Sequence, residues 1–137
     1  MMDAFYDYPV MRWAIGDVGA DYDRRLSVML DVFAASKFLR DYPALGVADD
    51  SERLVAVALV IPATRLPMPP ELERRYEELF SVLGAEGEAR LSAMSEVDAR
   101  LEVEEPHYYL TMISVRHSEQ GKGYARHLPA WLSGLPF

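Results

Sequence analysis

The sequence contains no cysteine, which excludes disulfide bonds, cysteine nucleophiles, cysteine-ligated zinc and iron–sulfur clusters. It has no long hydrophobic run either, since its longest, Leu54–Ile61, falls far short of the about 20 residues that a transmembrane helix needs. Basic residues are outnumbered, with 14 Lys and Arg against 22 Asp and Glu and a net charge of −8. The overall field therefore repels nucleic acid and anionic lipid. We expect a protein that binds neither.

The beginning of the sequence does not resemble a secretory signal. Asp3 and Asp7 lie in the first eight residues, and the first basic residue is Arg12. We therefore expect a cytoplasmic protein. With 137 residues, 50% of them hydrophobic and 26% charged, the chain suits one domain with its own core.

The pattern predicts an α+β fold in four successive parts. Residues 1–41 form a helical part rich in aromatic residues, 42–62 a hairpin, 70–104 a helical insert, and 106–133 a strand, loop and helix. The aromatic residues of the first part either cover an edge of the core or line an acceptor pocket. They are Phe5, Tyr6, Tyr8, Trp13 and Tyr22.

The hairpin is predicted from turn residues at 49–51 between two apolar strands, 42–48 and 54–61. The second strand is apolar on both faces, so we expect it at the centre of the sheet and covered on both sides.

Three helices are predicted around this hairpin. The first has Asp21 or Asp23 as its N-cap and ends near Arg40. Its apolar residues recur on one face of the helix, which we expect to lie in the core. That face comprises Leu30, Phe33, Ala34 and Phe38. The second helix begins at Pro70 and ends at Gly84, and the third covers 87–102.

The segment most informative about function follows Pro106. A strand is predicted over 107–115, then a glycine-rich turn, Gln120–Ala125, then a helix over 126–132. A helix N-terminus presents unpaired N–H groups, and glycines let an anion approach them closely. Arg116, Lys122 and Arg126 make this stretch locally cationic. These features indicate a site for a phosphate-bearing cofactor, although neither a P-loop nor a Rossmann fingerprint is present.

The turn reads Gln-Gly-Lys-Gly-Tyr-Ala, which matches the motif Gln/Arg-x-x-Gly-x-Gly/Ala. With the preceding strand, it resembles the GCN5-related N-acetyltransferases, a family with a mixed, mostly antiparallel sheet and flanking helices. The resemblance implies that acetyl-CoA is the cofactor and that an amine, on a small molecule or a peptide, accepts the acetyl group. The implied cofactor-binding residues are Ile113, Ser114 and Val115 for the pantetheine arm, and Gln120, Gly121, Lys122, Gly123, Tyr124 and Ala125 for the pyrophosphate.

The sequence departs from the family at the general base. The strand positions where many relatives carry Glu or His are Tyr109 and Thr111 here, and neither side chain is a good base near neutral pH. His107 and Tyr109 stay as weak catalytic candidates, with Glu104 and Glu105 behind them. The other two histidines, His117 and His127, show no metal-ligand spacing with His107, so no metal site is expected. Two alternatives therefore stay open: a catalytically impaired CoA-binding module, or an interaction protein built on the same fold.

The second departure concerns length. Relatives continue after the last predicted helix with a further strand, a helix and a closing strand pair, so we expect a chain that is shortened at its C-terminus. The strand over 107–115 would then lie at an open sheet edge, which invites pairing with another chain. The expectation is a homo-oligomer.

Overall fold

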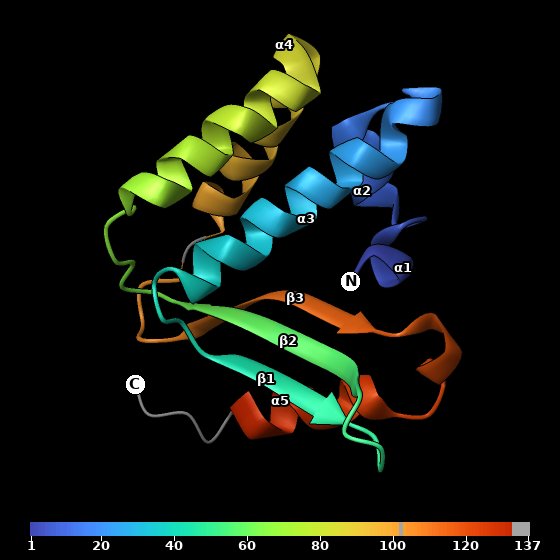
Figure 1. Ribbon diagram of the computed structural model, residues 1–137. Coiled ribbons are helices and arrows are strands. Elements are labelled where there is room, and N and C mark those ends of the chain that lie inside the picture. Colours follow the sequence, from blue (N-terminus) through green and yellow to red (C-terminus); the bar gives the residue numbers. More distant parts are fainter. Residues whose placement is uncertain (102, 133–137) are drawn as a thin grey trace.

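The computed structural model describes residues 1–101 and 103–132, and over these residues the fold is mixed α+β with an antiparallel sheet, as predicted (Figure 1). Its elements, in chain order, are α1 (Met2–Phe5), α2 (Pro9–Ile15), the 3-10 turn η1 (Gly19–Asp21), α3 (Tyr22–Phe38), β1 (Ala44–Ala48), β2 (Leu54–Pro62), α4 (Pro70–Arg100), β3 (Tyr108–Val115), the 3-10 turn η2 (His117–Glu119) and α5 (Tyr124–Leu132).

The sheet has the order β1-β2-β3, and both neighbouring pairs are antiparallel. The predicted hairpin is confirmed. Its turn is held by Asp49, whose carboxylate accepts hydrogen bonds from the backbone N–H of Ser51 (2.9 Å) and Arg53 (3.0 Å). The Arg53 side chain also donates to this carboxylate, and these contacts lower the pKa of Asp49. β2 is the central strand, as its apolar sequence predicted.

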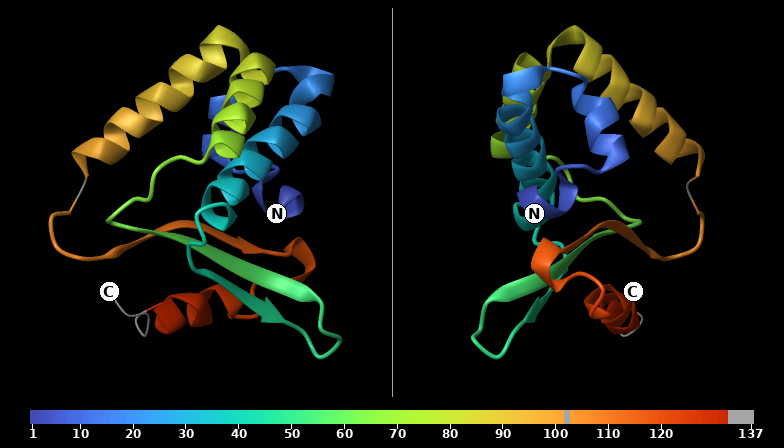
Figure 2. Two further views of the ribbon diagram at one scale, coloured as in Figure 1. Left: turned by 60° about the vertical axis from the view of Figure 1, so that its left-hand side comes forward. Right: turned by 90° about the vertical axis from the view of Figure 1, so that its right-hand side faces the viewer.

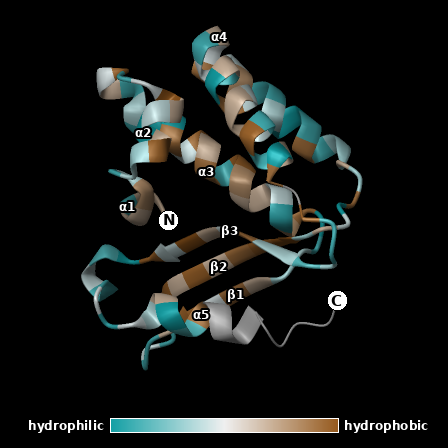
Figure 3. Cartoon of the chain, turned by 180° about the vertical axis from the view of Figure 1, so that it is seen from behind, coloured by the Kyte–Doolittle hydropathy of each residue, from teal (hydrophilic) through white to brown (hydrophobic). Residues whose placement is uncertain are grey.

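Helices lie on both faces of the sheet. Figures 1 and 2 show α1 to α4 on one face and α5 alone on the other. Side chains alternate along β2, so Leu59 enters the large core beneath α3 whereas Ala56 and Ala58 face Leu128 of α5. β2 is accordingly hydrophobic along most of its length in Figure 3.

Helix α3 begins as predicted and departs from the prediction near its C-terminal end. Asp21 occupies the N-cap position but makes no side-chain cap; its carboxylate instead accepts a hydrogen bond from Arg25 at 2.7 Å, which lowers the pKa of Asp21. Leu30 is buried as expected, but Phe38 is 60% exposed, so its assignment to the core is wrong. Eight residues turn an α-helix about 80° past its starting face, whereas seven bring it back to within about 20°. The buried position is therefore Lys37, only 5% exposed.

Helix α4 contains the predicted break at Gly84. This residue has φ +71°, in the left-handed region that glycine adopts without strain. The chain turns back there, so the two parts of α4 run in different directions (Figure 2). Nη1 of Arg25 donates to the Leu83 carbonyl at 3.1 Å, which satisfies one acceptor at the break. Of the segment predicted as the third helix, residue 102 lies outside the described residues.

Candidate functional site

Strand β3 carries a bulge at its middle. Met112 lies opposite Leu59 and Leu110 lies opposite Val60, so Thr111 is an extra residue on β3. Its hydroxyl donates to the Leu59 carbonyl at 2.9 Å. Bulges bend a strand and are frequent beside active sites.

Beyond the bulge, alternate residues of β3 direct their backbone N–H and C=O groups away from β2, toward the open edge of the sheet. The N–H of Arg116 donates to the Val55 carbonyl at 2.8 Å, so Arg116 and Ser114 direct their backbone groups toward β2. In an antiparallel pair the intervening residues direct theirs away, which places those of Ile113 and Val115 at the edge. Nε2 of Gln120 donates to the Val115 carbonyl at 3.3 Å from that side. Of the predicted trio, the backbone of Ser114 is thus committed to β2.

The glycine-rich turn opens directly onto helix α5. Gly121 and Gly123 have φ +79° and +88°, and no described atom lies within 4 Å of where a Cβ would stand on either. α5 begins at Tyr124, two residues earlier than predicted, so Tyr124 and Ala125 lie in its first turn, where N–H groups lack helical partners. The turn therefore presents open backbone donors beside a positive helix end, a geometry that suits a phosphate group.

The cations of this segment are partly engaged. Nζ of Lys122 lies 2.8 Å from a Glu119 carboxylate oxygen, and this hydrogen bond raises the pKa of Lys122. Nη2 of Arg116 donates to the Leu54 carbonyl at 3.3 Å. The Asp3 carboxylate of α1 accepts the N–H of His117 at 2.8 Å and ties α1 to the start of the turn. The local positive charge is therefore smaller than the sequence suggested.

Both catalytic candidates, His107 directly before β3 and Tyr109 on it, are engaged with backbone carbonyls. Nδ1 of His107 lies 2.6 Å from the Glu105 carbonyl, and its other ring nitrogen is buried without a hydrogen-bond partner among the described residues. The Tyr109 hydroxyl donates to the Leu101 carbonyl at 3.1 Å, and its ring lies edge-on to His107. Tyr109 borders the large cavity described next, and His107 does not. The structure thus brings the two candidates together without directing either at the turn.

A cavity of about 990 Å³ lies between β3, α3, both parts of α4 and the N-terminal helices. Along β3 it is bordered by Tyr109, Thr111, Met112 and Ile113, so it reaches both the bulge and the open edge. Its volume is at the upper end of the range for small-molecule sites.

The N-terminal aromatic residues divide between two roles. Phe5 and Tyr8 line the large cavity, and Phe5 is also part of the hydrophobic core. Tyr6 and Tyr22 instead pack edge to face, with the Arg12 guanidinium over both rings. Trp13 is half exposed.

The sequence interpretation missed Lys37, which lines the same cavity from α3. Burial, with the charge of Arg40 adding to it, lowers the pKa of Lys37 to about 8. The signal in the sequence was present but inconspicuous: a lysine seven residues after Leu30, on the buried face of the helix.

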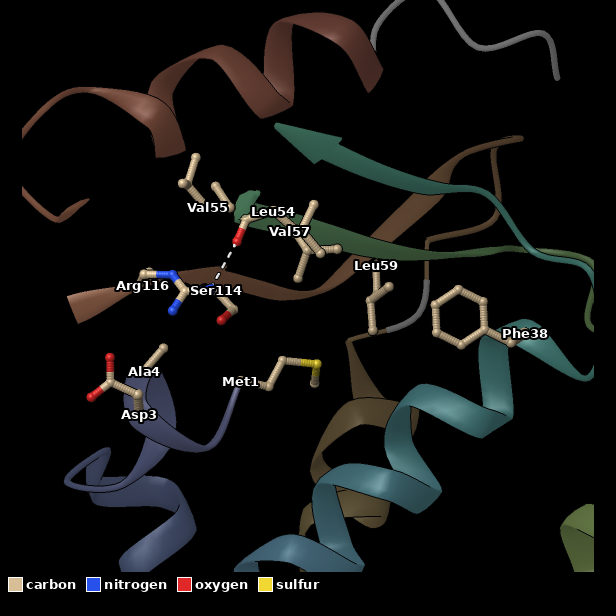
Figure 4. A pocket seen from close by; sticks show the side chains of 11 residues that line it. Met1, Asp3, Ala4, Phe38, Leu54, Val55, Val57, Leu59, Ser114 and Arg116 are labelled. Carbon is tan, nitrogen blue, oxygen red and sulfur yellow. Dashed lines mark hydrogen bonds between the residues drawn. The ribbon is translucent and has the colours of Figure 1, made fainter. Parts of the chain in front are cut away.

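A second, smaller cavity of about 320 Å³ opens on the face of the sheet that α1 and α3 cover. Phe38 lies at one end of it and Asp3 and Arg116 at the other, with Val57 and Leu59 of β2 between them (Figure 4). Its walls are mainly apolar, and the polar side chains on them are those of Asp3, Ser114 and Arg116. The Asp3 carboxylate already accepts the N–H of His117, so we base no catalytic proposal on this cavity.

Comparison with known proteins adds no assignment: no family model and no curated protein matches the chain. The resemblance at Gln120–Ala125 therefore stays a prediction. No helix in the described part of the chain combines the length and apolar character needed to cross a membrane. Across residues 1–101 and 103–132, no three or more His, Asp or Glu side chains cluster in a way that could hold a metal ion.

Proposed function

We propose that the chain binds acetyl-CoA along the open edge of β3 and the following turn, and transfers the acetyl group to an amine. The observation that carries this proposal is the continuity of three features. Backbone groups of Ile113 and Val115 at the edge of the sheet, where the Val115 carbonyl accepts from Gln120, lead into a turn with two left-handed glycines, and the turn leads into the N-terminus of α5. This order supports the resemblance to the GCN5-related N-acetyltransferases and to their fold.

The chain's residues fit the two ends of such a cofactor. The edge groups of Ile113 and Val115 would pair with the amide groups of the pantetheine arm, as a further strand would. The donors of Gly121–Ala125 would hold the pyrophosphate, and the absence of Cβ atoms at the two glycines leaves room for it. Acetyl-CoA would supply an activated thioester for attack by an amine.

The acceptor amine would approach from the large cavity, because that cavity reaches β3 at the bulge. Its walls would orient the amine and exclude water, and orientation of two reactants contributes strongly to such reactions. Tyr109 is a titratable side chain of β3 that borders the cavity. Its hydroxyl already donates a hydrogen bond to the Leu101 carbonyl. We therefore expect the proton of the attacking amine to leave through a water molecule.

A second candidate function is binding of CoA without turnover. It is favoured by the engagement of both His107 and Tyr109 with backbone carbonyls, which leaves no strong base at the bulge among the described β3 residues. An interaction protein without cofactor binding is the third possibility, and it predicts no affinity for any nucleotide.

Calorimetry separates these possibilities. Acetyl-CoA, CoA and ADP are titrated into the protein, followed by an assay of CoA release with a panel of amines. Binding of acetyl-CoA and CoA with amine-dependent CoA release supports the transferase. Binding without release supports the binding module. Failure of all three nucleotides to bind would overturn the cofactor assignment.

A further inference from the structure

The large cavity is lined by a buried lysine, Lys37, that forms no ion pair with the described residues. Lys37 is 5% exposed and lines the cavity, and among the described residues no carboxylate lies within 4 Å of its ammonium group. Its ammonium group lies over the ring of Phe33, with Nζ 5.8 Å from the ring centroid. Burying an unpaired charge is unfavourable, so its retention calls for an explanation.

Other charged groups on the cavity wall do not supply the missing partner. Arg40 is a second cation near Lys37, and its Nε donates to the Pro67 carbonyl at 3.3 Å. Arg65 adds a third on the same wall. The acidic members, Glu96 and Asp98, are exposed and come from the second half of α4. Arg65 is exposed like the two acidic residues and Arg40 is half-buried, so among the charged residues on this wall Lys37 is the buried one, in a chain whose net charge is −8.

The rest of the wall is mainly apolar and aromatic. It includes Phe5, Met11, Phe33, Ile61, Phe80 and Met112. Such a wall suits an apolar body, and one buried ammonium suits one anionic group on it.

We propose that this cavity binds an apolar or aromatic molecule with a single carboxylate, and that the carboxylate pairs with Lys37. Because the same cavity reaches Thr111 and Ile113 on β3, a ligand anchored at Lys37 can extend toward the open edge. Its identification as the acetyl acceptor, an amine that also carries a carboxylate, rests on the proposed function. Its binding to Lys37 does not.

The test uses three probes of the same shape and no acetyl-CoA: 4-phenylbutyrate, 4-phenylbutan-1-ol and 4-phenylbutylamine. Affinities are measured by calorimetry on the full chain. The carboxylate is expected to bind at least about tenfold more tightly than the alcohol, as a hydrogen bond to a charged partner implies. The amine is expected to bind most weakly.

Variants of Lys37 test whether this side chain causes the preference for the carboxylate. Lys37→Met gives an unbranched side chain one atom shorter and without charge, so it should bring the affinity for the carboxylate down to that for the alcohol. Lys37→Arg should keep the preference for the carboxylate. Arg24→Met removes an exposed cation from the same helix and should leave all three affinities unchanged.

Three outcomes would overturn the proposal: no measurable binding of the carboxylate, equal affinities of the three probes, or carboxylate binding that survives Lys37→Met in a variant shown to be folded. Should Lys37→Met fail to fold, the probe series on the wild type and on Lys37→Arg still decides. Acetyl-CoA binding is measured separately, so loss of the carboxylate site and loss of the cofactor site are distinguishable.

Discussion

Replacing Lys37 by Met should stabilise the protein, although the side chain is buried in a helix. Burial lowers the pKa of Lys37 from 10.5 to about 8. Each pKa unit corresponds to about 1.4 kcal/mol, so this shift represents about 3 kcal/mol of unfavourable free energy near neutral pH. Met has a similar length and no charge, so the variant should recover much of that penalty. A residue kept only for packing would show the opposite sign.

The same shift predicts how stability depends on pH. Below pH 8 both the folded and the unfolded states hold the proton, and the penalty is fully present. Between pH 8 and 10.5 the folded state loses the proton first, so the free energy of unfolding rises with pH. From pH 7 to 9.5 the rise is about 2 kcal/mol in the wild type and absent in Lys37→Met. Measurements stop at pH 9.5, since burial raises the pKa of Tyr76 and its titration reduces stability at higher pH.

Urea unfolding at pH 7 and at pH 9.5 measures both effects. Lys122→Met is the matched control, because Lys122 is the other lysine of the chain and is 55% exposed. With only two lysines, NMR titration of their Cε signals gives the pKa of Lys37 directly. A Lys37→Met variant less stable than the wild type at pH 7, or a Lys37 pKa near 10.5, would refute the reasoning.

Two further predictions concern the turn and the helix that follows it. Gly123→Val should abolish acetyl-CoA binding in calorimetry, because a branched Cβ would occupy the open side of the turn; its positive φ also costs about 1–3 kcal/mol of stability. Gly19→Val, at φ +53° and equally open, should show the strain without the loss of binding, and equal binding by both variants would contradict the assignment. Leu128→Ala should lower the free energy of unfolding by about 2–4 kcal/mol in urea, since Leu128 is 2% exposed and packs on Ala56 and Ala58. Leu110→Ala, at a 40% exposed position, should cost less than about 1 kcal/mol, and similar losses for the two would show that α5 is not docked through Leu128.

The hairpin and the break in α4 were predictable because their signals are local. An apolar strand over 54–61, a turn residue at Asp49 and a helix-breaking Gly84 each determine structure within a few residues. The prediction for Phe38 was wrong because its step of eight residues from Leu30 turns it about 80° away from the buried face, whereas the step of seven to Lys37 does not. The bulge at Thr111 was not predictable, since it depends on the register between β2 and β3.

The glycine-rich turn and the large cavity likewise differ in how far the sequence could predict them. The turn and its strand are contiguous in sequence, so motif and spacing located them. The large cavity is assembled from Phe5, Lys37, Met94 and Thr111, which no local pattern connects. Lys37 is the one residue that stands out in its local pattern. It becomes informative only once the structure shows that its side of α3 is buried.

The open edge of β3 links the predicted oligomer to the proposed cofactor. Pairing of two β3 strands would use the backbone groups of Ile113 and Val115, which are also the groups proposed for the pantetheine arm. The two events therefore compete, and acetyl-CoA should shift a β3-paired dimer toward the monomer.

Sedimentation velocity with and without acetyl-CoA measures this competition. Ile113→Pro removes an edge N–H and should dissociate the dimer while keeping the fold, whereas Ser114→Pro removes an N–H directed at β2 and should unfold the protein. A dimer that persists with acetyl-CoA bound, or that survives Ile113→Pro, would place the interface elsewhere and leave the edge to the cofactor alone.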